Sequence, residues 1–188
     1  MMSVVEIVGE IVKACENRLV IELTDNNGVS IPVTSPHINY IFGDSQYVKD
    51  ILDEYTRASF AEHCDKFPLV ALFTPVEESR GGSPKSNDVT LNMIIACSSH
   101  TEWANETRLQ TSFKKILHPI YERLMSEFCK HPMVIGEYDG IQHTYSENYS
   151  YGRYGAYTAS NDRVSEPIDA IDIRDLKMKV LTNNCIRK

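Results

Sequence analysis

Residues 168–181, IDAIDIRDLKMKVL, alternate apolar and charged side chains, and this alternation decides how the chain folds. It predicts a strand with one face buried and the other in water. Ile171 and Ile173 share one face of this strand, and further along Leu176, Met178 and Val180 share one face. Their parity slips between Arg174 and Asp175, which predicts a β-bulge, because half of the set would otherwise face water. A strand of this length must pair with others, so it belongs inside a sheet.

Two earlier stretches also predict strands. Residues 67–73, FPLVALF, and residues 89–98, VTLNMIIACS, are continuous apolar runs, which are typical of strands covered on both faces. The residues between them, about 74–88, are rich in Gly, Ser, Pro and charge. They predict a long exposed hairpin loop that joins neighbouring antiparallel strands.

The region before residue 45 predicts a hairpin and a short extended segment. Residues 19–33 alternate apolar side chains around Asn27-Gly28, a pair suited to a tight turn. Pro32 lacks an amide donor, which favours an edge position for the returning strand. Residues 37–42, HINYIF, predict a further extended segment.

Three stretches predict helices. Residues 4–15 carry an apolar stripe at helical spacing, and Ser3 with Glu6 forms a capping box. A second helix starts after Asp44 or Ser45, with one face made of Tyr47, Val48, Ile51, Leu52 and Tyr55.

The third predicted helix is the longest, and Ser99 with Glu102 offers it a capping box. Its apolar stripe consists of Leu109, Phe113, Ile116, Leu117, Ile120, Leu124 and Phe128. Pro119 removes one backbone hydrogen bond and predicts a kink near His118, and the helix ends at His131-Pro132.

Periodicity disappears over residues 136–167, where six of the ten tyrosines lie. We expect a long Tyr- and Gly-rich interaction loop there, because a loop of this length in a compact domain is usually functional or disordered. The whole chain, residues 1–188, therefore predicts a single α+β domain. It combines a mainly antiparallel β-sheet, helices packed on one face, a long hairpin and the long tyrosine-rich loop.

Composition and charge limit the possible functions. The chain has a net charge of −7, which argues against broad binding to a phosphate backbone. No apolar run approaches the roughly 20 residues that span a bilayer, and the N-terminus does not resemble a signal peptide. The five cysteines are scattered, so we expect buried reduced thiols rather than a disulfide framework.

The search for chemistry gives only weak candidates. Residues 97–102, CSSHTE, bring Cys97, Ser99 and His100 to a strand-to-helix junction, but a helix cap needs the same residue types. Residues 62–64 and 129–131 contain potential metal ligands without metal-site spacing. His118 with Glu122 is either a proton-transfer pair or a surface contact. The glycines of residues 79–87 lack the context of a P-loop. We therefore expect no catalytic residue, cofactor or metal.

Interface residues are better supported. Tyrosine offers a large amphipathic contact area at low entropy cost and is enriched at protein interfaces. The candidates in the tyrosine-rich loop are Tyr149, Tyr151, Arg153, Tyr154 and Tyr157, and those in the hairpin are Glu77, Glu78, Arg80 and Lys85. The alternative for the tyrosines is that their rings cover the domain's own sheet.

Several stretches, in this order, resemble the small neck and tail-completion proteins of tailed bacteriophages, in particular the tail-terminator-like group. They are INYIFGDSQYVKDIL (38–52), FPLVALFTPVEES (67–79), LNMIIACSSHTEWANETRLQTSFKKILHPIYERLM (91–125) and IDAIDIRDLKM (168–178). The resemblance suggests the crAss-like phages of the gut as the source of such a chain. The long tyrosine-rich stretch before the last strand departs from the family pattern.

The resemblance implies a non-catalytic α+β subunit of the virion. Copies of the chain would form a ring at the portal-to-tail junction, where the hairpin and loops contact neighbouring copies or adjacent neck, portal and tail proteins. Genomic DNA would pass nearby without being specifically bound, and no membrane is involved. Two alternatives stay open. One is a small intracellular hydrolase or metal-dependent enzyme centred on residues 97–102, and the other is a partner-binding protein that never enters a particle.

Overall fold

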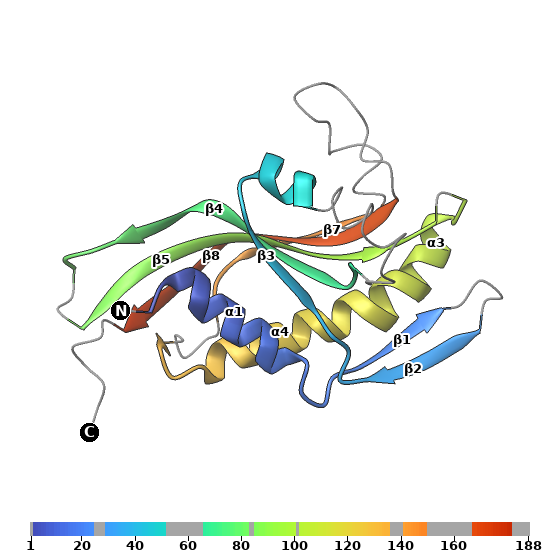
Figure 1. Cartoon of the computed structure of the whole chain (residues 1–188), viewed down its shortest axis with the longest axis horizontal. Coiled ribbons are helices and arrows are strands. Elements are labelled where there is room, and N and C mark those ends of the chain that lie inside the picture. The colour runs from blue at the N-terminus through green and yellow to red at the C-terminus, as the bar shows by residue number, and fades with distance from the viewer. Residues whose placement is uncertain are drawn as a thin grey trace.

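The computed structural model describes residues 2–24, 29–51, 66–82, 85–100, 102–135, 141–149 and 167–181 (Figure 1). The helices are α1 (Val4–Cys15), α3 (Asn105–Arg108), the π-helix η1 (Leu109–Leu117) and α4 (His118–Lys130). The strands are β1 (Val20–Thr24), β2 (Ser30–Thr34), β3 (Asn39–Gly43), β4 (Leu69–Ser79), β5 (Ser86–Ser98), β6 (Val134–Ile135), β7 (Thr144–Asn148) and β8 (Ile168–Leu181). Residues 45–51 are also helical. The predicted α+β class is confirmed.

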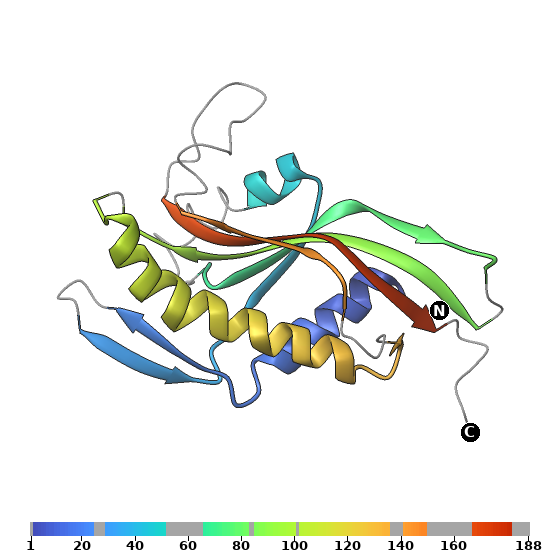
Figure 2. The ribbon, with the colours of Figure 1, turned by 180° about the vertical axis from the view of Figure 1, so that it is seen from behind.

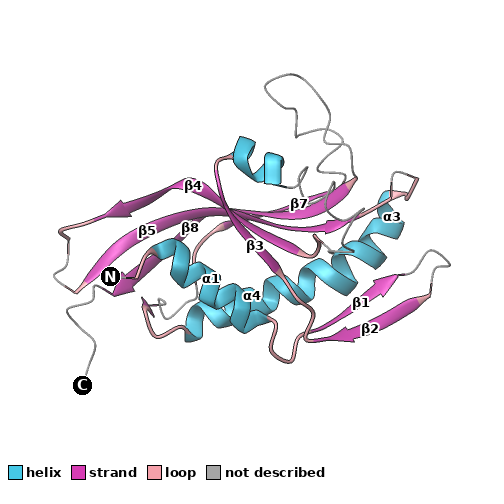
Figure 3. Ribbon diagram, viewed as in Figure 1, coloured by secondary structure: helices cyan, strands magenta, loops and turns pink. Residues whose placement is uncertain are grey.

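The main sheet has the strand order β3-β4-β5-β8-β6, and β7 pairs with the same edge of β8 as β6 does (Figures 2 and 3). Its strands are antiparallel except for the parallel pair β3–β4. The last strand therefore has neighbours on both sides, which confirms that it belongs inside a sheet. Its first residues, Ile168–Ile171, are buried on both faces, whereas its second half alternates between buried and exposed side chains. A separate ribbon, β1–β2, projects from the body of the molecule beside the long helix (Figure 1).

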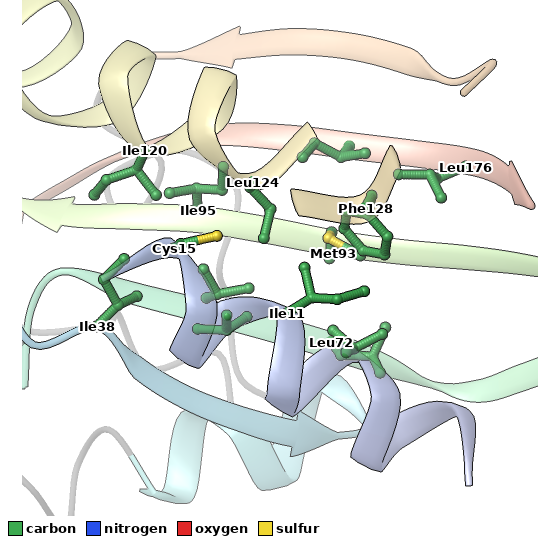
Figure 4. Packing of buried hydrophobic residues seen from close by; sticks show 14 of the residues in the cluster. Ile11, Cys15, Ile38, Leu72, Met93, Ile95, Ile120, Leu124, Phe128 and Leu176 are labelled. Atoms are coloured by element: carbon green, nitrogen blue, oxygen red, sulfur yellow. The ribbon is translucent and has the colours of Figure 1, made fainter. Parts of the chain in front are cut away.

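The main core lies between the sheet and the two long helical elements. Ile11 and Cys15 of α1 and Phe128 of α4 point toward Met93 and Leu72 on the sheet (Figure 4). Fully burying an apolar side chain of this size stabilises the fold by about 1.5–3 kcal/mol. The β-branched helix α1 therefore depends on this packing, and its capping box is confirmed by a 2.6 Å hydrogen bond from the Ser3 amide to Glu6 Oε2.

The opposite face of the sheet is also covered at one end, so helices are not confined to one face as expected. Val48 of the helical segment 45–51 packs with Leu69, Ala71 and Ile94, which point away from the main core. The continuous apolar runs in β4 and β5 predict this cover, because their residues are buried on both faces.

The bulge predicted in the last strand is confirmed. Leu91 pairs with Leu176 and Met93 pairs with Ile173, so Asn92 faces two residues of β8. One of them, Asp175, adopts a left-handed φ of 54°, and its amide donates to Asn92 Oδ1 at 3.0 Å. The side-chain hydrogen bond supports the strained residue, and the bulge returns the apolar side chains of β8 to the core.

The long helix differs from its prediction at both its start and its centre. It begins at Asn105 rather than after Ser99, because Ser99 is buried against the sheet. The irregularity at Pro119 takes the form of π-type bonding in the preceding segment, where the His118 amide donates to Phe113 O. Proline has no amide for the carbonyl four residues earlier, which disrupts regular α-helical bonding there.

Two predicted loops contain strands. Much of the predicted hairpin loop, 74–88, continues the pairing of β4 with β5, because β4 extends to Ser79 and β5 begins at Ser86. A register shift between Phe73 and Glu77 accommodates Pro75. Within 136–167, β7 pairs with β8. Its sequence, TYSEN, lacks apolar alternation, so periodicity could not reveal it.

Candidate functional site

The exposed large apolar side chains of the described residues gather in two places. The first is the β1–β2 ribbon, with Val20, Leu23, Val29 and Ile31. The second is the end of β3 and the helical segment after it, where Phe42 and Tyr47 are 49% and 51% exposed. Ile135 and Tyr145 are further exposed side chains elsewhere. Grouped exposed apolar side chains mark interaction surfaces more often than scattered ones do.

The ribbon is fixed at its base and exposed along its outer part. Ile21 is buried in the main core, and its cross-strand partner Val33 packs against the same core. The next pair, Leu23 and Ile31, is exposed. Lys115 of η1 donates to Ser30 Oγ, so the helix holds the ribbon in place. β1 lies between the helix and β2 in both views (Figures 1 and 2), which leaves β2 on the outside.

The β3 surface is positioned by α1. The Tyr40 hydroxyl donates to Val5 O at 2.9 Å, and its ring packs where Gly9 has no side chain. Gly43 similarly lets the Tyr47 ring approach the strand end, since a Cβ there would collide with that ring. The exposed rings of Phe42, at the end of β3, and of Tyr47, in the helical segment after it, are called the aromatic edge below.

The predicted hairpin residues are partly brought together. Arg80 Nε donates to Glu78 Oε2 at 2.9 Å, and Asn87 Nδ2 donates to the same oxygen at 3.4 Å. Glu77 and Lys85 are exposed. Exposed ion pairs contribute little to stability, so this end of the hairpin is a charged surface rather than a built site.

Of the five candidate interface residues in the tyrosine-rich loop, the structure describes only Tyr149. Its hydroxyl donates to Glu147 Oε2 at 2.9 Å, and its ring centroid lies 4.3 Å from that of Phe113. Tyr149 thus covers the chain's own helix, which is the alternative that the sequence left open. Tyr151, Arg153, Tyr154 and Tyr157 lie outside the described residues and stay predictions.

Glu147 is the centre of a polar cluster that sequence reasoning missed. His118 Nε2 lies 2.7 Å from Glu147 Oε1, and the Tyr145 hydroxyl donates to the same oxygen at 2.8 Å. The predicted pairing of His118 with Glu122 is therefore wrong. The spacing of Tyr145, Glu147 and Tyr149 at every second residue could have indicated a shared face of a strand.

The pKa values of this cluster follow from its bonds. Burial opposes ionisation of Glu147, but hydrogen bonds from His118, Tyr145 and Tyr149 outweigh it and lower the pKa of the carboxyl. Burial, followed by the hydrogen bond to Glu147, raises the pKa of Tyr149 to about 12. Because each donor is committed to Glu147, the cluster fastens β7 to the helix and leaves no poised acid or base.

A second pair beside it fastens the chain before β7. His143 Nδ1 lies 2.7 Å from the carbonyl of Ile141, which can only accept, so Nδ1 carries the proton. The other ring nitrogen of a neutral His143 then accepts from the Tyr121 hydroxyl at 2.7 Å. The Tyr121 ring also meets Tyr145 edge-on, with centroids 4.9 Å apart.

The candidate nucleophile of residues 97–102 is enclosed. Cys97 is buried, and burial together with the nearby Asp169 charge raises the pKa of its thiol well above the usual range. Ser99 Oγ accepts from Arg108 Nη1 at 2.7 Å, and the same nitrogen lies 2.7 Å from Asp169 Oδ1. Arg108 also binds the carbonyl of His100. The segment thus forms the surroundings of a buried ion pair.

Potential metal ligands are not gathered in the described ranges, where no group of three His, Cys, Asp or Glu side chains could hold an ion. Cys129 is an exposed thiol, while His131 Nε2 lies 3.3 Å from Glu10 Oε2. Residues 62–64 lie outside the described part. A cavity of about 300 Å³ opens beside β6 and is lined mainly by polar residues of β5 and β8.

Two further observations concern the chain as a whole. Within the residues that the structure describes, no helix has the length and apolar character needed to cross a bilayer. The chain matches no protein-family model, no curated protein and no solved structure. Functional argument therefore rests on the surfaces and clusters above.

Proposed function

We propose that this chain is a non-catalytic structural subunit that assembles with copies of itself into a ring in the neck or tail of a tailed bacteriophage. The role is that of a tail-terminator-like head–tail connection, and the chain would be located in the virion. The sequence resemblance supports this assignment, and the distribution of exposed apolar surface supports the assembly.

The observation that carries the proposal is the separation of two unlike apolar surfaces. The ribbon exposes Leu23 and Ile31, whereas the β3 surface exposes Phe42 and Tyr47. A ring needs a heterologous contact, in which one patch of a subunit meets a different patch of the next. A chain with two non-equivalent patches on a rigid fold meets that requirement.

The charge of the chain suits a position beside a DNA channel. A net charge of −7 disfavours adhesion of passing duplex DNA, whose phosphates are also negative. Adjacent portal and tail proteins are the further expected partners, and the charged hairpin residues Glu78 and Arg80 are candidate contacts for them.

The enzyme alternative has less support from the geometry. Cys97 is buried with a raised thiol pKa, and Ser99 is occupied by Arg108. A nucleophile needs access to substrate and an activating base, and neither accompanies these two side chains. A partner-binding protein outside the particle would use the same apolar surfaces, so only the location of the chain distinguishes it from a ring subunit.

The deciding experiment is quantitative mass spectrometry of stringently purified particles from the source of this sequence. We expect a fixed low copy number relative to the major capsid protein, consistent with one ring. Absence of the chain from such particles would overturn the proposal and favour a role outside the virion.

A further inference from the structure

Two exposed edges of the main sheet, the outer half of β4 and strand β3, differ in the features that prevent another strand from pairing with them. The outer half of β4, beyond its pairing with β3, carries Pro75, a register shift and the acidic Glu77 and Glu78. Proline, bulges and charges are the usual devices that prevent edge-to-edge association. Strand β3, Asn39–Gly43, contains neither a proline nor a charged residue.

The hydrogen bonds around β3 show which of its main-chain groups face outward. The Asn39 amide donates to Pro68 O at 2.9 Å on the β4 side, whereas the Ile38 amide donates to Glu16 Oε1 at 2.8 Å on the other side. Because main-chain groups alternate along a strand, those of Tyr40 and Phe42 point away from β4. In the described part of the chain no main-chain group pairs with them. β3 is thus an open edge flanked by the exposed Phe42 and Tyr47 rings.

The outer strand of the ribbon offers complementary groups. The Ser35 amide donates to Leu19 O at 2.7 Å, and Pro32 pairs with Glu22 three positions further into the ribbon. By alternation, the carbonyls of Ser30 and Pro32 face outward, and the missing amide of Pro32 falls on that open side. Pro32 thus protects β2 from an edge that needs a donor at this position, as Pro75 does for β4. The carbonyls of Ser30 and Pro32 remain as acceptors, and β3 presents the amides of Tyr40 and Phe42 as donors.

We propose that the open edge of β3 binds the outer strand, β2, of the ribbon of a second copy of this chain. The inference rests on the proposed function and names the contact between ring subunits. Copies with a net charge of −7 repel one another, and a contact through uncharged surface adds no further repulsion. Residues 29–34 and 39–43 are both uncharged, and both expose large apolar side chains.

The pairing combines main-chain and side-chain recognition. Added strands gain affinity from main-chain hydrogen bonds and specificity from the side chains beside them. The apolar side chains of Val29 and Ile31 would meet the aromatic edge of Phe42 and Tyr47. Since the ribbon and the end of β3 lie on different parts of the molecule (Figure 1), each copy gives one contact and receives another.

The test measures self-association of the full-length chain by sedimentation velocity. F42P removes an outward amide without touching the bonds to β4, and I31D places a charge on the exposed part of the ribbon. Each variant should weaken association by at least about tenfold, as loss of an interface hot spot does. F42A retains the amide and should give a smaller loss. I135A is the matched control, because Ile135 is exposed elsewhere, on β6.

Mixing the two variants gives the decisive result. F42P retains its ribbon and I31D retains its β3 edge, so the mixture should form one-to-one dimers and nothing larger. Circular dichroism and thermal melts verify that both variants fold. Residue-resolved amide exchange should show Tyr40 and Phe42 protected in the assembled wild type and in the I31D copy of the mixed dimer, but not in I31D alone, with Ile41 and Gly43 of I31D protected throughout.

Three outcomes overturn the inference: a wild type that stays monomeric up to its solubility limit, F42P that assembles like the wild type, or a mixture that yields only monomers. None of these affects the particle copy number that tests the proposed function. Conversely, intact β3–ribbon assembly by a chain absent from particles would remove the ring proposal and leave this contact standing.

Discussion

Two polar clusters fasten the long helix to the strands on either side of residues 150–166, and they differ in their access to water. Arg108 and Asp169 join the start of the helix to β8 with side chains 1% and 0% exposed. His118 and Glu147 join its centre to β7 with side chains 31% and 27% exposed. Asn148 of β7 pairs with Ala170 of β8, so the two clusters join the helix to neighbouring strands.

The two clusters should differ in two properties, the free energy lost when the contact is broken and the dependence of that loss on pH. A buried charge that loses its partner cannot be solvated by water. Removing one partner of the Arg108–Asp169 pair therefore destabilises the fold strongly, even if the intact pair contributes little net stability. The Glu147 cluster is partly hydrated, so its loss costs less but depends on protonation. The following predictions test whether the more buried cluster loses more free energy of unfolding when one of its charges is removed.

The largest effect is expected from R108M. It leaves the Asp169 carboxylate buried without the guanidinium, which should lower the free energy of unfolding by about 3–5 kcal/mol. The double variant R108M/D169L, which removes both charges, should recover much of that loss. Urea denaturation measures both. A loss as large in the double variant as in R108M would show that packing, rather than the unpaired charge, decides the effect.

A smaller loss is expected from E147Q. The amide cannot accept charge-assisted hydrogen bonds from His118, Tyr145 and Tyr149, and the partly exposed site limits the loss to about 1–2 kcal/mol. The same denaturation experiment at neutral pH checks it. E147Q that equals the wild type in stability would mean that solvent replaces the cluster, and that β7 is held by its pairing with β8 alone.

The effect of E147Q should also depend on pH. The folded-state pKa of Glu147 is lowered, so its contribution is present above the unfolded-state pKa and is lost as the pH falls through the folded value. The stability difference between E147Q and wild type should therefore shrink in acid. Asp172 supplies a control of opposite sign.

Burial raises the pKa of Asp172 and Arg174 only partly offsets it, so the ionised form destabilises the fold and protonation relieves that cost. D172N should be at least as stable as wild type at neutral pH and should lose that advantage in acid. Urea denaturation at several pH values follows both variants. Parallel pH dependences for E147Q and D172N would contradict these assignments.

Patterns within one element could be predicted from the sequence, whereas contacts between elements could not. The bulge at Asp175 follows from a parity slip inside one strand, and the capping box at Ser3 follows from residues three apart. The helical segment 45–51 covers the other face of the sheet because β4 and β5 are apolar on both faces. Their continuous apolar runs show in the sequence that a cover is needed, but not which element supplies it.

The site illustrates the same limit. Pairing of His118 with Glu122 was inferred from helical spacing, but Glu147, from a strand without apolar alternation, supplies the true partner. The apolar character of Ile31 and Phe42 is visible in the sequence, yet exposure depends on which residues the rest of the fold leaves uncovered. Burial and hydrogen bonding between residues far apart in the sequence depend on the tertiary structure, and neither periodicity nor composition reveals them directly.

The smallest effect is expected from Y145F, which removes one of the donors to Glu147. Tyr145 is 37% exposed and Glu147 retains its bonds from His118 and Tyr149, so the loss should be about 0.5–1 kcal/mol. The edge-on ring contact with Tyr121 stays intact, because phenylalanine keeps the ring.

Y149F is the matched comparison, since its hydroxyl binds the other carboxylate oxygen and its ring lies against Phe113. Less water reaches that ring, so Y149F should cost at least as much as Y145F in urea denaturation. A larger loss for Y145F than for E147Q would reverse the ranking, because it would place the stabilisation in the Tyr145 hydroxyl rather than in the carboxylate that all three donors share.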